Sequence, residues 1–141
     1  MLTHDSLSFL TSDVGARLLD DLATQDLDDR HTLALLTRLR KTYPAQHAAA
    51  ALEMARLRRK GADKFGADAA RLFFTADALE QASDPLVRAY RARRAPETVL
   101  DVCCGIGADS LAFAARGAQV VGIDLDPLRV AHRHRLFKDT I

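Results

Sequence analysis

One stretch of the chain, residues 98–127, limits the possible folds more than any other. It reads TVLDVCCGIGADSLAFAARGAQVVGIDLDP, and short apolar runs at 99–102 and 119–123 flank a glycine-rich turn and a helical pattern at 108–116. A strand that passes through a tight glycine turn into a helix, and then into a second strand, is typical of a parallel α/β sheet. The sequence therefore predicts a βαβ unit in the last third of the 141-residue chain.

The turn of this unit has the features of a nucleotide site. Gly105 and Gly107 lack a Cβ, so a ligand can approach their backbone N–H groups closely at the start of a helix. Asp124 follows the second strand, close to the ~20-residue spacing at which an acid binds ribose hydroxyls. The third glycine of a dinucleotide fingerprint would fall at Ser110, and the lysine of a P-loop is missing. Both of those nucleotide classes are therefore disfavoured.

The motif that remains, Asp-x-Cys-Cys-Gly-x-Gly followed by VVGIDLDP, resembles the cofactor motifs of class I methyltransferases that use S-adenosylmethionine (SAM). The resemblance implies that Asp101 and the Gly105–Gly107 backbone surround the amino-acid end of SAM, and that Asp124 binds its ribose. The family usually has glycine in place of Cys103, and a cysteine there is similar to RNA-modifying members such as the trimethylguanosine synthases. The implied cofactor-binding residues are Asp101, Cys103, Gly105, Gly107 and Asp124.

The segment before this motif extends the resemblance. Residues 64–94 look like the corresponding segment of bacterial methyltransferases with a THUMP-like domain, and together the matches cover about residues 50–131. That family implies RNA, either tRNA or rRNA, as the substrate.

The N-terminal part of the chain predicts helices. Ser12 can cap one helix, Asp28 or Asp29 can start a second that ends before Pro44, and an alanine-rich third at 46–60 has a stop signal in Gly61. The predicted fold class is α/β, with an N-terminal α-helical subdomain followed by an incomplete Rossmann-like, doubly wound sheet. The boundaries expected are 1–62 for the helical subdomain, 63–95 for a helical lead-in and 96–141 for the first half of the SAM-binding domain.

The lead-in holds two further helix starts. Thr75 can cap a brief helix, and Asp84 before Pro85 combines a capping side chain with a proline in the first helical position. The second helix would place Leu86, Val87 and Tyr90 on one side, and we expect that side to pack on the sheet.

Cysteine and histidine usage excludes several site classes. The two cysteines, Cys103 and Cys104, are adjacent, so they suit neither a disulfide framework nor a metal pair, and both are expected to pack in the turn. Asp126, before Pro127, is expected to cap a further helix. His132 and His134 are two residues apart and do not share a helix face, so no metal site is expected there. With no signal peptide and no membrane-length apolar run, the expected location is the cytoplasm.

Basic residues gather upstream of the turn, although the whole chain has a net charge of only +1. The cluster allows two interpretations: a solvated helix end with favourable dipole contacts, or a surface that contacts RNA phosphates. The residues concerned are Arg56, Arg58, Arg59, Lys60 and Lys64.

The expected sheet has only two strands, and a doubly wound sheet usually has about five or six. No Asn/Asp-Pro-Pro-aromatic loop is present, so no catalytic residue can be named. The exposed strand edge predicts either self-association or an unstable domain. Two hypotheses remain: a SAM-dependent methyltransferase acting on RNA, or a catalytically inactive fragment that serves as a helical binding or assembly module.

Overall fold

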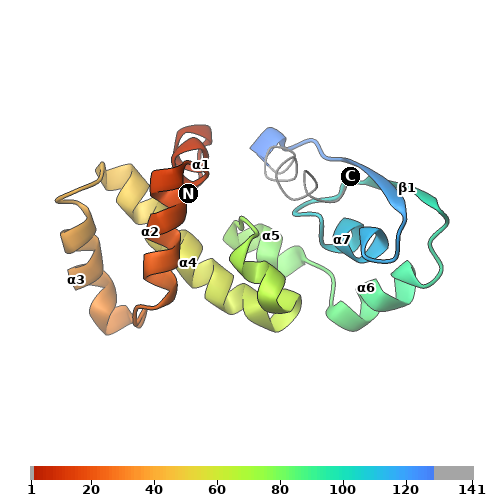
Figure 1. The fold of residues 1–141 in the computed structure, drawn as a ribbon, viewed down its shortest axis with the longest axis horizontal. Helices are drawn as coiled ribbons and strands as arrows, with labels where there is room; N and C mark the ends of the chain where they lie inside the picture. Colours follow the sequence, from red (N-terminus) through yellow and green to blue (C-terminus); the bar gives the residue numbers. More distant parts are fainter. Residues whose placement is uncertain (1, 129–141) are drawn as a thin grey trace. The chain divides into compact units, whose positions relative to one another are not determined.

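The computed structural model describes residues 2–128 and divides the chain into two compact units, Met1–Lys60 and Gly61–Ile141 (Figure 1). The first unit contains α1 (His4–Leu10), α2 (Asp13–Ala23), α3 (Asp29–Leu39) and most of α4 (Ala45–Phe65). The second contains the end of α4, the 3-10 helix η1 (Gly66–Ala70), α5 (Ala76–Gln81), α6 (Pro85–Ala92), β1 (Thr98–Val102), α7 (Ala108–Ala114) and β2 (Gln119–Ile123). None of the helices in residues 2–128 has the length and apolar character needed to cross a membrane.

Three predicted helix starts are confirmed by capping hydrogen bonds. The Ser12 hydroxyl accepts from the Gly15 N–H at the start of α2, at 3.2 Å. The other two caps are Thr75, which accepts from the Ala78 N–H at 3.2 Å, and Asp84, which accepts from the Leu86 N–H at 2.8 Å. Each cap satisfies a backbone donor that the first turn of a helix leaves without a partner.

Helix α1 is a finding that the sequence did not predict. It begins with a capping box in which Ser6 N–H donates to the Thr3 hydroxyl and Thr3 N–H donates to the Ser6 hydroxyl. The usual signature of such a box has Glu or Gln in the third helical position, and this chain has the shorter serine. The first unit therefore contains one helix more than expected.

The prediction that Gly61 ends the third of the expected helices is wrong. Helix α4 continues through Gly61 to Phe65, and the chain turns at Gly66, where φ is +56°. A Cβ on residue 61 would lie 3.0 Å from two ring atoms of Phe74, which is 1% exposed. Glycine at position 61 therefore allows an aromatic ring to approach the helix, and the stop signal lies five residues later.

The core of the first unit is built largely of leucines from α1 to α4, of which Leu10 and Leu22 are each 1% exposed. Helices α1 and α2 approach each other unusually closely near Gly15. A Cβ on residue 15 would lie 2.1 Å from the Phe9 carbonyl oxygen and 2.6 Å from the Leu10 Cα. This separation is possible only for glycine, so Gly15 fixes how α2 follows α1.

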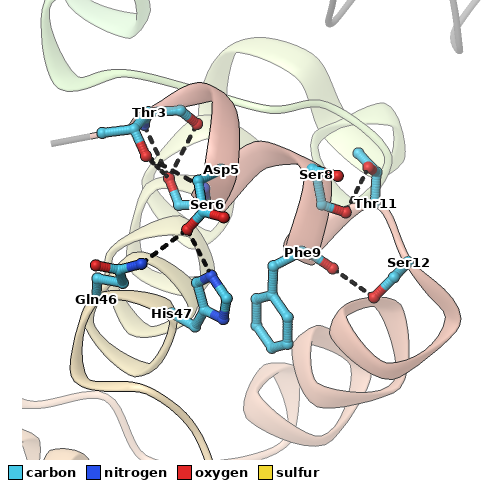
Figure 2. Close-up of polar contacts among 9 residues, drawn as sticks. All are labelled: Thr3, Asp5, Ser6, Ser8, Phe9, Thr11, Ser12, Gln46 and His47. Atoms are coloured by element: carbon cyan, nitrogen blue, oxygen red, sulfur yellow. Dashed lines mark hydrogen bonds and ion pairs between the residues drawn. The ribbon is translucent and has the colours of Figure 1, made fainter.

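A polar and aromatic contact joins α1 to the start of α4 (Figure 2). One oxygen of the Asp5 carboxylate accepts from Gln46 Nε2 at 2.8 Å and lies 2.8 Å from His47 Nε2. The Phe9 ring stacks on the His47 imidazole, with ring centroids 4.3 Å apart, and lies 5.7 Å from the Tyr43 ring. These contacts hold the N-terminal helix on the unit without a buried charge.

The second unit confirms the predicted βαβ arrangement. β1 and β2 pair in parallel, with Leu100 opposite Val121 and Val102 opposite Ile123, and α7 connects them (Figure 1). Gly117, with a φ of +87°, terminates helix α7. The Gly117 and Ala118 N–H groups donate to the Ala114 and Phe113 carbonyls, at 2.9 and 3.2 Å, which is the hydrogen-bond pattern of a Schellman motif.

The two faces of this small sheet differ. Helix α7 packs against both strands. On one face, alternate side chains are exposed although they are apolar: Leu100 is 60% exposed, Val102 63%, Val121 59% and Ile123 50%. In α/β sheets with parallel strands both faces are normally covered by helices. The described residues therefore cover one side of a sheet whose sequence suits burial on both.

The prediction that α6 buries Leu86, Val87 and Tyr90 is wrong. These side chains are 82%, 43% and 48% exposed, and α6 instead buries Arg88 and Ala92. The Arg88 guanidinium lies 4.5 Å above the Phe65 ring and donates to the Lys64 carbonyl. A long side chain with an aromatic face and a carbonyl as partners can be buried in place of an apolar one.

Burial lowers the pKa of the Arg88 guanidinium, and Asp109, Asp84 and Asp68 oppose this shift. Lys64, at the end of α4, is also held by contacts within the chain. Its ammonium donates to the carbonyls of Leu79, Glu80 and Ala82 at 2.9 to 3.1 Å, at the C-terminal end of α5. A cation there complements the negative end of the helix dipole.

Candidate functional site

The glycine turn between β1 and α7 has the geometry of a ligand-binding turn. Gly105 and Gly107 have φ values of +56° and +81°, and Gly107 is the N-cap residue of α7. The Gly107 N–H donates to the Cys104 carbonyl at 2.8 Å, and the Cys104 N–H donates to the Ile123 carbonyl at 3.0 Å. The hydrogen bond from Cys104 holds the turn against the end of β2, next to Asp124, the acid that follows this strand.

Asp124 lies directly against this turn. One of its carboxylate oxygens accepts from the Gly105 N–H at 2.7 Å, and the other accepts from the Asp126 N–H at 3.0 Å. Asp124 thus connects the glycine turn to the start of the segment that follows β2. The structure therefore brings together Gly105 and Asp124, two of the residues predicted from the motif.

Asp101 contacts helix α7. Its carboxylate accepts from the Ser110 hydroxyl, and Ser110 is fully buried in α7. In a dinucleotide-binding turn the corresponding position is a glycine, which lets the helix pack closely on the strand. Here a small hydroxyl side chain forms a polar link between α7 and β1. Asp101 thus links the helix to the strand at the edge of the turn.

The adjacent cysteines have unlike environments. Cys104 is buried, as expected, and the prediction that Cys103 packs in the turn is wrong, because its side chain is exposed. Cys103 is the non-glycine residue among 2–128 with positive φ, at +61°. A side chain in this left-handed conformation costs about 1–2 kcal/mol relative to the ordinary helical region. This is also the position at which the methyltransferase motif usually has glycine.

Replacing Cys103 with glycine is expected to stabilise the protein by about 1 kcal/mol. Relief of the left-handed strain exceeds the larger chain entropy of glycine in the unfolded state, and little burial is lost because the thiol is exposed. Urea denaturation followed by circular dichroism measures the change. Cys103→Ala keeps a Cβ at the same φ and serves as the control. Equal stability of the alanine and glycine variants would show that the turn is not strained.

A polar hollow of about 170 Å³ opens beside the turn, between residues 78–83 and 103–109. Ser83 donates to the Asp109 carboxylate at 2.8 Å, and Arg91 pairs with the same oxygen at 3.0 Å. The other oxygen, Asp109 Oδ1, is buried and has no hydrogen-bond partner among the described residues. This cluster connects α6 and the end of α5 to the first turn of α7. Sequence reasoning missed it, although an acid in a first helical turn is a common signal.

Asp126 has the role expected of a helix cap, since its carboxylate accepts from the Leu128 N–H at 2.9 Å. The remainder of the helix predicted after Pro127 lies outside the described residues, as do His132 and His134. Within 2–128, no group of three or more His, Cys, Asp or Glu side chains is arranged to hold a metal ion.

The predicted basic patch is occupied by contacts within the chain. Arg56 pairs with Asp29, and Arg59 donates to the Gln25 carbonyl at 2.7 Å. Burial lowers the pKa of Arg58 to about 10, against the opposing effect of Asp20, so it stays charged at neutral pH. These contacts tie α4 to α2, α3 and the loop between them. The prediction that Arg56, Arg58, Arg59, Lys60 and Lys64 contact RNA stays a prediction.

Comparison with known proteins points in the same direction as the turn. An uncharacterized SAM-dependent methyltransferase of Mycobacterium tuberculosis, recorded for two strains, is 38% identical over 92 residues. The chain is similar to methyltransferases. A ubiquinone biosynthesis O-methyltransferase of Pseudomonas paraeruginosa is 56% identical over 48 residues, which are 33% of this chain and 21% of that protein.

The extent of these matches limits what they establish. The mycobacterial alignment covers 60% of this chain, and the chain spans about a quarter (26%) of the relative's length. Residues 3–61 match the model of a domain of unknown function, DUF8688. No solved structure gives a significant match.

Proposed function

We propose that this protein binds SAM at the Gly105–Gly107 turn and is the cofactor-binding part of a SAM-dependent methyltransferase. The single observation that carries the proposal is the 2.7 Å hydrogen bond from the Gly105 N–H to Asp124, which joins the turn to the acid after β2. The names of the relatives support the same cofactor and the same class of enzyme.

The chemistry of the turn suits SAM. A Cβ on Gly105 would meet no atom within 4 Å, so a ligand can approach the turn at Gly105. A carboxylate such as Asp124 can accept hydrogen bonds from ribose hydroxyls, and the nearby carboxylates suit the positive charges of the sulfonium and the α-ammonium group. The polar hollow beside Cys103–Ile106 has room for the amino-acid end of the cofactor.

The cofactor would supply a methyl group activated by its sulfonium: a nucleophilic atom of the substrate would attack the methyl carbon in line, and S-adenosylhomocysteine would leave as a neutral thioether. The residues described here would hold and orient the cofactor: Gly105 through the open space beside its Cα, Gly107 at the start of α7, and Asp124 through its carboxylate. Orientation of this kind accounts for much of the rate in group transfer. The activating base for the acceptor is not among the residues that we assign.

For the substrate we propose RNA, and for the subfamily the methyltransferases with a THUMP-like domain. The support is Cys103 in the motif, which is similar to RNA-modifying members, together with the resemblance of residues 64–94. Cytoplasmic location belongs to the same proposal.

A second candidate function rests on the exposed sheet. Leu100, Val102, Val121 and Ile123 form an apolar face, and a two-stranded sheet has open edges. A protein of this kind can act as a binding or assembly module, and its sheet edge can pair with a second copy. Sedimentation that detects a dimer, together with an absence of SAM binding, would favour this function over the first.

The direct test is isothermal titration calorimetry of the 141-residue chain with SAM and with S-adenosylhomocysteine. We expect saturable binding at one site, with a Kd between about 1 µM and 1 mM, as is usual for substrates of enzymes. A sample with the expected helical circular dichroism and no heat of binding for either compound would overturn the proposal for this chain.

A further inference from the structure

Helix α6 presents a cationic and aromatic surface. Tyr90 is 48% exposed, the Arg94 guanidinium lies 4.0 Å from its ring centroid, and the Arg93 guanidinium lies 6.0 Å from it. An exposed aromatic ring can stack on a planar ligand with a face that no guanidinium covers, while the cations beside it bind nearby anions. The sequence predicted that Tyr90 is buried, so this surface becomes evident only in the structure.

A groove of about 480 Å³ adjoins this ring, between α6 and α7. Its apolar lining includes Phe65, Leu111 and Ala115. Its cationic lining includes Arg93, which also reaches Tyr90, and Arg116 at the end of α7. The volume lies in the range of small-molecule sites, roughly 300–1,000 Å³. Groove and ring therefore form one surface, with Arg93 shared between them.

The charges of the groove favour an anion. Lys64, Arg88, Arg93 and Arg116 line it, and among residues 2–128 Asp68 is the one acid in its lining. Lys64 is committed to the α5 carbonyls, and Arg88 is buried against Phe65 and near three acids. Arg93 and Arg116 are both exposed, which makes them the cations best placed to meet a ligand.

We propose that this surface binds single-stranded nucleic acid, with a base stacked on Tyr90 and phosphates bound by Arg93 and Arg116. The inference builds on the RNA substrate proposed above and assigns it to a surface outside the SAM turn and the Arg56–Lys60 patch. A stacking ring beside cations is the recurring arrangement of single-strand sites. An acidic protein segment is the weaker candidate, because it has no base to use the Tyr90 ring.

The test is fluorescence anisotropy of the whole chain with a labelled 12-nucleotide single-stranded RNA of mixed sequence, in the absence of SAM. Changing Tyr90 to alanine is expected to weaken binding about tenfold, since each stacked base contributes strongly, and to leave the salt dependence unchanged. Changing Arg93 and Arg116 together to alanine should weaken binding and lower the slope of log K against log salt by about 1.4, or ~0.7 for each phosphate contact.

Matched controls separate the groove from other causes. Arg30→Ala removes an exposed arginine of the helical unit, and Arg59→Ala with Lys60→Ala tests the predicted patch. Both controls should bind within about twofold of the unchanged chain. A greater loss in the patch variant than in the groove variant would overturn the inference.

Four further outcomes would support or contradict the inference. Unchanged binding in the Tyr90 variant, or displacement of the RNA by poly-glutamate as readily as by unlabelled RNA, would contradict a nucleic-acid site. Equal binding of single-stranded DNA would assign the surface to either nucleic acid, and preference for RNA would support the proposed substrate. Because SAM is absent, this result does not depend on whether the cofactor proposal is correct.

Discussion

Replacing Asp124 with alanine is expected to weaken SAM binding by about a hundredfold or more. Hydrogen bonds to a charged group contribute about 1.5–3 kcal/mol each, and two ribose hydroxyls would lose their acceptor together. The same change also leaves the Gly105 N–H without its carboxylate partner at 2.7 Å, so the turn itself is disturbed. Isothermal titration calorimetry with SAM gives the affinity directly.

Two control variants make this result specific. Asp126→Ala removes an acid two residues away that caps the following helix, and we expect its SAM affinity to stay within about threefold. Asp124→Asn keeps an acceptor for the Gly105 N–H and loses the charge, so it should fall between the alanine variant and the unchanged chain. If Asp124→Ala binds SAM as tightly as the unchanged chain, the acid does not belong to the cofactor site.

Replacing Gly15 with alanine is expected to destabilise the helical unit by about 3 kcal/mol or more. The new methyl carbon would lie 2.1 Å from the Phe9 carbonyl oxygen and 2.6 Å from the Leu10 Cα, and both are backbone atoms. Backbone cannot move aside as a flexible side chain can, so α1 and α2 must separate. Thermal and urea denaturation, followed by helical circular dichroism, measure the loss.

Gly66→Ala is the matched comparison for this change. Residue 66 has φ of +56°, but a Cβ there would meet nothing within 4 Å. The alanine is therefore opposed only by the left-handed backbone conformation, at about 1 kcal/mol. Equal destabilisation by the two variants would mean that the close approach of α1 to α2 is not as described.

The local signals in the sequence were reliable where the structure depends on neighbouring residues. Ser12, Thr75 and Asp84 cap the helices that follow them, because a cap requires only a side-chain acceptor and a backbone donor two or three residues later. The βαβ order was likewise predictable from the two apolar runs and the turn between them.

The errors arose where distant residues decide the outcome. From the sequence alone, Gly61 is a plausible helix end. Its place inside α4 is explained only by the Phe74 ring, which packs against it. The apolar side of α6 was expected to be buried, but Phe65 and the Lys64 carbonyl provide partners that bury Arg88 instead. Neither partner can be recognised from the spacing of residues within the helix.

In the candidate site, too, features that depend on neighbouring residues could be predicted, and features that depend on distant residues could not. The position of Asp124 beside Gly105 follows from the order of strand, turn, helix and strand, and the role of Asp126 as a cap was also predictable. The hydrogen bond from the Ser110 hydroxyl to Asp101 could not be predicted. The sequence showed only that Ser110 stands where a dinucleotide fingerprint has its third glycine. The cluster of Ser83, Arg91 and Asp109 joins three segments, so it required the fold.

The apolar face of the β1–β2 sheet has a consequence for how the protein folds as it is synthesised. The helices of the first unit bury their own leucines, and they leave the ribosome first. The strands emerge later and carry Leu100, Val102, Val121 and Ile123 on an open face. Until that face is covered, it is the part of the described chain most exposed to aggregation and to capture by chaperones.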